Sequence, residues 1–114
     1  MKYSNVVVAG GGVLGSQIAF QAAYCGFNVT IWLRSEGSIG RTQPKIDHLK
    51  QTYIDAIEKM AEDKNAWCAG LADEDTFDKE KCLKKVENAY ANLKLELDMA
   101  EAVADADLVI ESMA

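Results

Sequence analysis

The chain has 114 residues, of which 49% are hydrophobic and 26% are charged, a composition typical of one soluble globular domain. Its formal net charge of -6 opposes binding to the phosphates of DNA or RNA, so we expect no nucleic-acid partner. The three cysteines show no paired spacing and form an odd count, which favours free thiols in a reducing compartment, with the cytoplasm as the default. The uncharged stretch that begins at Val6 contains several glycines and amide side chains, which favours a folded core over a signal peptide or membrane span.

The first 33 residues predict a β-turn-α-β unit. Residues 5–9 are β-branched and small apolar residues followed by three glycines, the pattern of a strand buried in a parallel sheet. Apolar residues then recur at helical spacing from Val13 to Cys25, and Gly26 ends the pattern. Residues 29–33 form a second β-rich run, and a right-handed crossover must join the two parallel strands.

The middle of the chain predicts a helical hairpin over about residues 44–91. Residues 35–41 contain two glycines and two serines, so we expect a surface loop, with Pro44 in the first turn of the next helix. Residues 63–75 are expected to form a loop anchored by Trp67, with the second helix beginning near Asp75 or Thr76. Two apolar stripes define the hairpin: Ile46, Leu49, Tyr53, Ile57 and Met60 in the first helix, and Leu83, Val86, Tyr90 and Leu93 in the second.

The last part of the chain predicts two more strands and a short helix. Leucines alternate with charged residues over 93–97, Asp98 and Glu101 form an acidic capping box, and residues 108–110 form the last strand. The expected fold is α/β: one dinucleotide-binding domain over residues 1–114, with an incomplete Rossmann-type parallel sheet in the order 3-2-1-4. We expect the last strand to expose apolar surface and to favour self-association.

A glycine-rich motif follows the first predicted strand. Residues 10–15, Gly-Gly-Gly-Val-Leu-Gly, satisfy G-x-G-x-x-G between a strand and a helix. Gly10 permits the tight turn, Gly12 removes a side chain that would block a pyrophosphate, and Gly15 lets the helix approach the strand. The helix that begins near Val13 directs its free N–H groups toward the phosphates. The alternative is a glycine-rich turn that binds nothing.

The end of the second strand bears on the choice of cofactor. NAD sites place an acidic residue there to bind the adenosine ribose, and this position is Leu33. Arg34 and Ser35 can instead bind a 2'-phosphate, with Arg41 as a second candidate cation, so the sequence favours NADP(H) over NAD(H). NAD(H) remains the alternative if Glu36 reaches the ribose through a local bulge or if Arg34 is a solvated loop residue.

Two segments carry a family resemblance. Residues 6–20, Val-Val-Val-Ala-Gly-Gly-Gly-Val-Leu-Gly-Ser-Gln-Ile-Ala-Phe, and 98–112, which include Ala-Asp-Ala-Asp-Leu-Val-Ile-Glu-Ser, resemble the N-terminal domain of the 3-hydroxyacyl-CoA dehydrogenase family. The long hairpin is similar as well. The resemblance implies an oxidoreductase of fatty acid metabolism that interconverts 3-hydroxyacyl-CoA and 3-ketoacyl-CoA by hydride transfer to or from nicotinamide. It assigns the pyrophosphate loop to Gly10, Gly12, Val13, Leu14 and Gly15, and the strand end beside the cofactor to Ser112 and Met113. Family members usually have an acidic residue at Leu33, so this departure puts NAD preference in doubt.

The resemblance also implies what this chain does not contain. The family's catalytic serine, histidine, asparagine and glutamate, and its helical C-terminal domain for dimerisation and acyl binding, correspond to sequence beyond Ala114. We therefore expect no catalytic residue and no metal site here, and a fragment that is inactive alone but belongs to a homo-oligomer in full length. We interpret His48 as a surface residue and Cys25 as a small buried filler. Lys45 and Lys50 are either contacts for a CoA phosphate or part of a solvated helix face.

Two other functions remain open from the sequence. One is a non-catalytic Rossmann-like module for nucleotide sensing or protein interaction, which the missing catalytic groups favour. The other is the cofactor domain of a different NADP-dependent hydroxyacid or keto acid reductase, which would share the glycine motif and an arginine near position 34.

Overall fold

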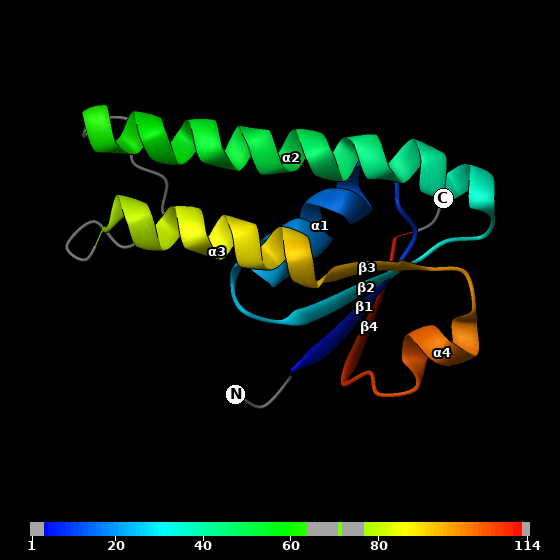
Figure 1. Cartoon of the computed structure of the whole chain (residues 1–114). Helices are drawn as coiled ribbons and strands as arrows, with labels where there is room; N and C mark the ends of the chain where they lie inside the picture. The colour runs from blue at the N-terminus through cyan, green and yellow to red at the C-terminus, as the bar shows by residue number, and fades with distance from the viewer. Residues whose placement is uncertain (1–3, 64–70, 72–76, 113–114) are drawn as a thin grey trace.

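The computed structural model of the protein describes residues 4–63, 71 and 77–112, and these form an α/β structure on a parallel sheet (Figure 1). In chain order the elements are β1 (Asn5–Ala9), α1 (Val13–Tyr24), β2 (Asn28–Trp32), α2 (Glu36–Glu62), α3 (Lys79–Asn92), β3 (Leu93–Glu96), α4 (Met99–Val103) and β4 (Leu108–Glu111). The sheet has the order β3-β2-β1-β4. The predicted fold class and strand order are confirmed.

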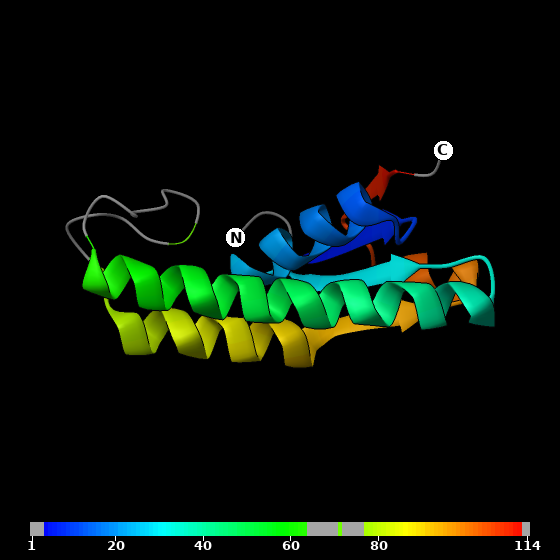
Figure 2. The same cartoon turned by 90° about the horizontal axis from the view of Figure 1, so that it is seen from above.

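The core lies between the two central strands and α1. Val6 pairs with Val29 and Val8 with Ile31, and all four side chains are at most 4% exposed. They pack with Phe20, which is fully buried on α1. Helices α1, α2 and α3 cover this face of the sheet, whereas α4 lies against the opposite face (Figures 1 and 2). The β-branched runs therefore form the buried strands that their composition predicts.

The region that the sequence assigns to a loop is the start of a helix. Residues 36–41 belong to α2, and Ser35 is its N-cap, whose side chain accepts the backbone N–H of Ser38. Pro44 is therefore the ninth residue of α2 and not part of its first turn. Glycine and serine content predicted a loop, but the capping bond of Ser35 starts the helix two turns earlier. The expected surface loop over residues 35–41 is thus wrong.

Helices α2 and α3 form the predicted hairpin and lie side by side in both views (Figures 1 and 2). The buried stripe includes Ile57 and Val86, both fully buried. On the exposed side of the hairpin, the Tyr90 hydroxyl donates to Oδ1 of Asp47 at 2.6 Å, and this bond lowers the pKa of the Asp47 carboxyl. Helix α3 begins at Lys79 after its N-cap Asp78, and not near residues 75 or 76, while the predicted anchor at position 67 lies outside the described residues.

Helix α2 also packs on α1 through aromatic side chains. The Tyr53 ring meets the edge of Phe20 at a centroid distance of 4.7 Å. Its hydroxyl donates to Oε1 of Gln21 at 2.5 Å, and burial raises the pKa of Tyr53 to about 12. The apolar stripe of α2 thus packs against both of its neighbours, α1 and α3.

The C-terminal elements follow the prediction closely. Asp98 caps α4 by accepting the backbone N–H of Glu101 at 3.2 Å. Asp107 accepts the backbone N–H groups of Ser4 and Asn5, and these two bonds hold the pKa of its carboxyl below the usual value. Strand β4 forms one edge of the sheet, and its Leu108 and Val109 are 44% and 49% exposed. The expected exposure of apolar surface on this strand is confirmed for these two residues.

Within the described ranges, no helix has the combination of length and apolar character that a membrane crossing requires. Cys25 and Cys82 are both free thiols, the first exposed and the second buried. The expectation that Cys25 is a buried filler is therefore wrong, because it lies at the exposed C-cap of α1.

Candidate functional site

The turn between β1 and α1 has the backbone geometry that the glycine motif predicts. Gly10 has a φ of 114°, a conformation that side chains strongly disfavour, and its N–H donates to the Trp32 carbonyl at 3.0 Å. A Cβ at Gly15 would lie 2.3 Å from the Gly10 carbonyl oxygen and 2.5 Å from Oγ of Ser112. Gly10 therefore makes the turn, and Gly15 lets α1 start directly against it.

Gly12 differs from these two glycines because it faces open space. A Cβ at Gly12 would have no atom within 4 Å. Gly12 is also the N-cap of α1, which has neither a capping side-chain bond nor an acidic residue in its first turn. Among the described residues, no side chain caps the first N–H groups of α1, and this end of the helix favours an anion. A diphosphate fits the uncovered backbone at this position.

A pocket of about 320 Å³ adjoins this turn and brings together residues from four parts of the chain. Five of the residues assigned to the cofactor site from the sequence line it: Gly10, Gly12, Leu33, Arg34 and Ser112. Gly11, Trp32 and Ser38 complete its lining, which contains no carboxylate. The carboxyl ends of β1 and β2 lie next to the first turn of α2 (Figure 1). The lining residues place the pocket at these strand ends. This edge of a parallel sheet is where such folds bind ligands.

The remaining assigned residues lie around the pocket. Val13 and Leu14 are 66% and 65% exposed on the first turn of α1. The Ser112 hydroxyl lies near the Ala9 and Gly10 carbonyl oxygens, at 3.2 Å and 3.3 Å, and thus ties the end of β4 to the turn. Met113 lies outside the described residues.

Leu33 occupies the place of the expected ribose carboxylate, but its side chain turns inward. It is only 3% exposed, and its Cδ2 would lie 2.6 Å from a Cβ at Gly11. The next residue, Arg34, is exposed and lines the pocket. Glu36, the carboxylate weighed as a substitute, is exposed in the first turn of α2 and is not among the lining residues.

The first turns of α2 form a cluster of hydroxyl and guanidinium groups beside Arg34. Oγ of Ser35 and Oγ of Ser38 are 3.2 Å apart, and Nη2 of Arg41 donates to Oγ of Ser38 at 3.0 Å. Arg41 was expected on a surface loop, whereas it lies on α2 and donates this bond to Ser38. The arrangement places two guanidinium groups and two hydroxyls at a helix N-terminus, a combination suited to a phosphate.

Four residues at or beside the site were missed in the sequence: Gly11, Trp32 and Ser38, which line the pocket, and Thr42, which supports the turn. Ser38 could have been found, because Ser35 and Ser38 have the spacing of an N-cap and its N3 residue. Gly11 is the variable position of the motif, yet a Cβ there would lie 2.3 Å from Oγ1 of Thr42. Thr42 is 2% exposed on α2 and donates to the Gly11 carbonyl, a tertiary contact that no local pattern indicates.

The other candidate residues take no part in the pocket. His48 is exposed on α2, as expected for a surface residue. Nζ of Lys45 donates to the Gly11 carbonyl at 3.4 Å, and Nζ of Lys50 pairs with Glu87 at 3.5 Å. Both lysines thus make contacts within the protein. No group of three or more histidine, cysteine, aspartate or glutamate residues in the described part of the chain could hold a metal ion.

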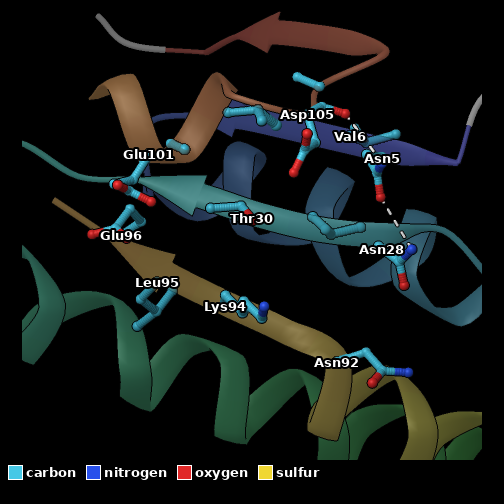
Figure 3. Close-up of a pocket in the computed structure, with 14 residues that line it drawn as sticks. Asn5, Val6, Asn28, Thr30, Asn92, Lys94, Leu95, Glu96, Glu101 and Asp105 are labelled. Carbon is cyan, nitrogen blue, oxygen red and sulfur yellow. Dashed lines mark hydrogen bonds between the residues drawn. The ribbon is translucent and has the colours of Figure 1, made fainter. Parts of the chain in front are cut away.

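A larger cavity of about 690 Å³ lies on the opposite face of the sheet, beside α4 (Figure 3). Figure 3 shows carboxylates of Glu96, Glu101 and Asp105 around it, with Lys94 as the basic residue among those labelled. Three carboxylates repel a diphosphate, and Gly12 at the N-terminus of α1 is not among the residues that line this cavity. The smaller pocket at the glycine turn is therefore the candidate site, despite its size.

Comparisons with known proteins agree with this geometry. Residues 5–114 match the family model described as 3-hydroxyacyl-CoA dehydrogenase, NAD binding domain. A probable 3-hydroxyacyl-CoA dehydrogenase of Caenorhabditis elegans is 27% identical over 112 residues, which are 98% of this chain and 31% of the worm protein. This chain thus spans about a third of the length of that relative.

Solved structures show the same fold. A diketoreductase, whose structure is described in terms of dicarbonyl compounds, is 33% identical with a TM-score of 0.70, over 99% of this chain and 32% of its own. FadB2 of Mycobacterium tuberculosis is 24% identical with a TM-score of 0.64, over 100% of this chain and 32% of its own. The 3-hydroxybutyryl-CoA dehydrogenase of Escherichia coli is 22% identical with a TM-score of 0.62, over 100% of this chain and 19% of its own. With a family match over nearly all its residues and a glycine turn that fits a diphosphate, the chain belongs to the 3-hydroxyacyl-CoA dehydrogenase family of oxidoreductases, in which it corresponds to the NAD-binding domain.

Proposed function

We propose that this domain binds a nicotinamide dinucleotide with a preference for NADP(H), and serves an enzyme that interconverts 3-hydroxyacyl-CoA and 3-ketoacyl-CoA. The observation that carries the proposal is the open backbone at Gly12, where the uncapped N-terminus of α1 meets the pocket. When held by the residues of this pocket, a nicotinamide dinucleotide would supply the hydride acceptor for oxidation at C3 of the hydroxyacyl group, or the hydride donor for the reverse reduction. The residues of this domain hold the diphosphate and the adenosine ribose.

The preference for NADP(H) is supported by the direction of the Leu33 side chain. An acidic residue at this position would accept hydrogen bonds from the ribose hydroxyls and repel a 2'-phosphate. Leu33 does neither, because it is buried against Gly11 and Thr42. The lining of the pocket supplies Arg34 in place of a carboxylate.

The cluster on α2 supports the same preference. Ser38 lines the pocket, and the guanidinium of Arg41 is fixed on its hydroxyl at 3.0 Å. A phosphate between Arg34 and Ser38 would meet positive charge from one guanidinium directly and from Arg41 nearby. The N-terminal N–H groups of α2 add to this field.

Calorimetric titration of the 114-residue chain with NADPH and NADH tests the proposal. We expect NADPH to bind more tightly, and Arg34→Ala to weaken NADPH binding roughly five- to tenfold while changing NADH binding little. Lys59→Ala, which removes an exposed cation from the last turn of α2, is the matched control and should change neither. Equal affinity for both cofactors in the unaltered protein would refute the preference. A folded protein that binds neither would refute dinucleotide binding.

A second candidate substrate class is favoured by one observation, the 33% identity to a diketoreductase. In that case the enzyme would reduce a free dicarbonyl compound and not a thioester. Assaying the intact natural enzyme that carries this domain with acetoacetyl-CoA and a free diketone as competing substrates separates the two. The first proposal requires the thioester to be preferred.

A further inference from the structure

The carbonyl of Gly11 is the meeting point of three side-chain donors. Oγ of Ser16 lies at 3.1 Å, Oγ1 of Thr42 at 3.2 Å and Nζ of Lys45 at 3.4 Å from its oxygen. Ser16 belongs to α1, whereas Thr42 and Lys45 reach the turn from α2. A carbonyl oxygen has two lone pairs, so these three donors fully engage it.

The two closer donors, Ser16 and Thr42, are polar side chains in the buried core, where apolar residues are the rule. Ser16 and Thr42 are 1% and 2% exposed, and they are the buried polar side chains of the described core. A buried hydroxyl costs free energy unless it is hydrogen-bonded, and an alanine or valine would fill such a place without that cost. Both hydroxyls are satisfied by the same carbonyl, in the middle of the glycine turn.

Thr42 also supports the turn by direct contact. A Cβ at Gly11 would lie 2.3 Å from its Oγ1 and 2.9 Å from its Cγ2, so the Gly11 backbone rests against this side chain. Thr42 stands one helical turn after Ser38, which lines the pocket. One side chain of α2 thus joins the first turns of that helix to the backbone beside Gly12.

We propose that Thr42 is a positioning residue for the dinucleotide, which holds the diphosphate turn in register with the ribose end of the site on α2. This inference rests on the proposed function. Without the Thr42 hydroxyl, the Gly11–Gly12 backbone loses its shorter, buried bond to α2 and keeps only the longer one from Lys45, so a ligand that spans both ends binds less well. A ligand that occupies only the ribose end is not affected.

The test compares Thr42→Val, Thr42→Ser and Thr52→Val by calorimetry with NADPH and with 2'-AMP, which lacks the diphosphate. Thr52 is the matched control, because it lies on α2, is exposed, and donates to the His48 carbonyl of the same helix. We expect T42V to weaken NADPH binding about three- to tenfold, the effect of losing one hydrogen bond. T42S should restore binding to within about twofold, T52V should leave it unchanged, and all variants should bind 2'-AMP equally. If T42V does not fold, Thr42→Ala, which only removes atoms, takes its place with the same expectation.

Each other result has a distinct meaning. If T42V and T52V bind NADPH with equal affinity, the positioning role of Thr42 is overturned and the proposed function still stands. Equal loss of NADPH and 2'-AMP binding would also overturn it, because the effect would then be a general loss of structure. Failure of the unaltered protein to bind NADPH and NADH would overturn the proposed function, and this inference with it.

Discussion

One added methyl group should have different consequences at two adjacent glycines of the turn. At Gly11 a Cβ would lie 2.3 Å from Oγ1 of Thr42, more than 1 Å short of the 3.4 Å at which ordinary contact begins. Thr42 is a short, branched and buried side chain that cannot rotate away, so the turn or α2 must shift. Overpacking of this kind costs about 1–3 kcal/mol. At Gly12 the same methyl group would meet nothing within 4 Å.

We therefore expect Gly11→Ala to lower the free energy of unfolding by about 1–3 kcal/mol, measured by urea denaturation. Gly12→Ala should lower it by less than about 1 kcal/mol, the usual difference between glycine and alanine at an N-cap. NADPH binding should respond differently from stability. G12A should remain folded but lose most of its affinity for NADPH, because its methyl group would occupy the space that we propose for the diphosphate.

A double variant isolates the steric reason. Thr42→Ala removes both atoms that a Cβ at Gly11 meets on α2, so G11A/T42A should be more stable than the sum of the two single effects predicts. Strict additivity, or a G11A protein as stable as G12A, would refute the reasoning. Retention of full NADPH affinity by G12A would refute the placement of the diphosphate.

Three further predictions concern stability. Gly40→Ala should raise the free energy of unfolding by about 0.5–1 kcal/mol in urea denaturation, because Gly40 is inside α2 and a Cβ there meets nothing within 4 Å; no gain would contradict this. The pKa of Asp107 is lowered in the folded state by its bonds to backbone N–H groups, so its carboxylate stabilises the fold above its unfolded pKa, and this contribution is lost as the pH falls through the folded pKa. The urea midpoint of Asp107→Asn should accordingly fall less on acidification than that of the unaltered protein. Burial raises the pKa of Tyr53 from its ordinary value of 10 to about 12, so the fold should lose stability as the pH rises from 10 to about 12. The urea midpoint of Tyr53→Phe should fall less over that pH range. Equal losses in the variant and the unaltered protein would contradict this prediction.

The elements that the sequence predicted correctly are those whose signal is local. The β-branched run at residues 5–9, the capping aspartate Asp98 and the glycine motif each determine their structure through neighbours in the chain. Strand order followed from the Rossmann-type pattern that the glycine motif indicates, and the hairpin from its two apolar stripes. The predicted start of α2 was wrong because the glycine and serine content of residues 35–41 outweighed the weaker capping signal of Ser35.

The site was predicted in part for the same reason. Gly10, Gly12 and Arg34 were identified because a motif or a strand end marks them, and they line one pocket. The role of Thr42 could not be predicted, because a threonine 31 residues after Gly11 in sequence acquires its partner only when α2 packs on the turn. The inward direction of the Leu33 side chain likewise depends on that packing.

Pro44 divides α2 into two segments, and the second does not need the first in order to remain helical. Proline lacks the N–H that would bond to the Gly40 carbonyl, and it is well accommodated as the first residue of a helix. The hairpin segment from Pro44 to Glu62 can therefore persist as a helix while residues 36–43 unwind. We therefore expect residues 36–43, which include the proposed phosphate contacts, to open as a local unit, with backbone amides that exchange with deuterium sooner than those of the hairpin and slow down when cofactor is added.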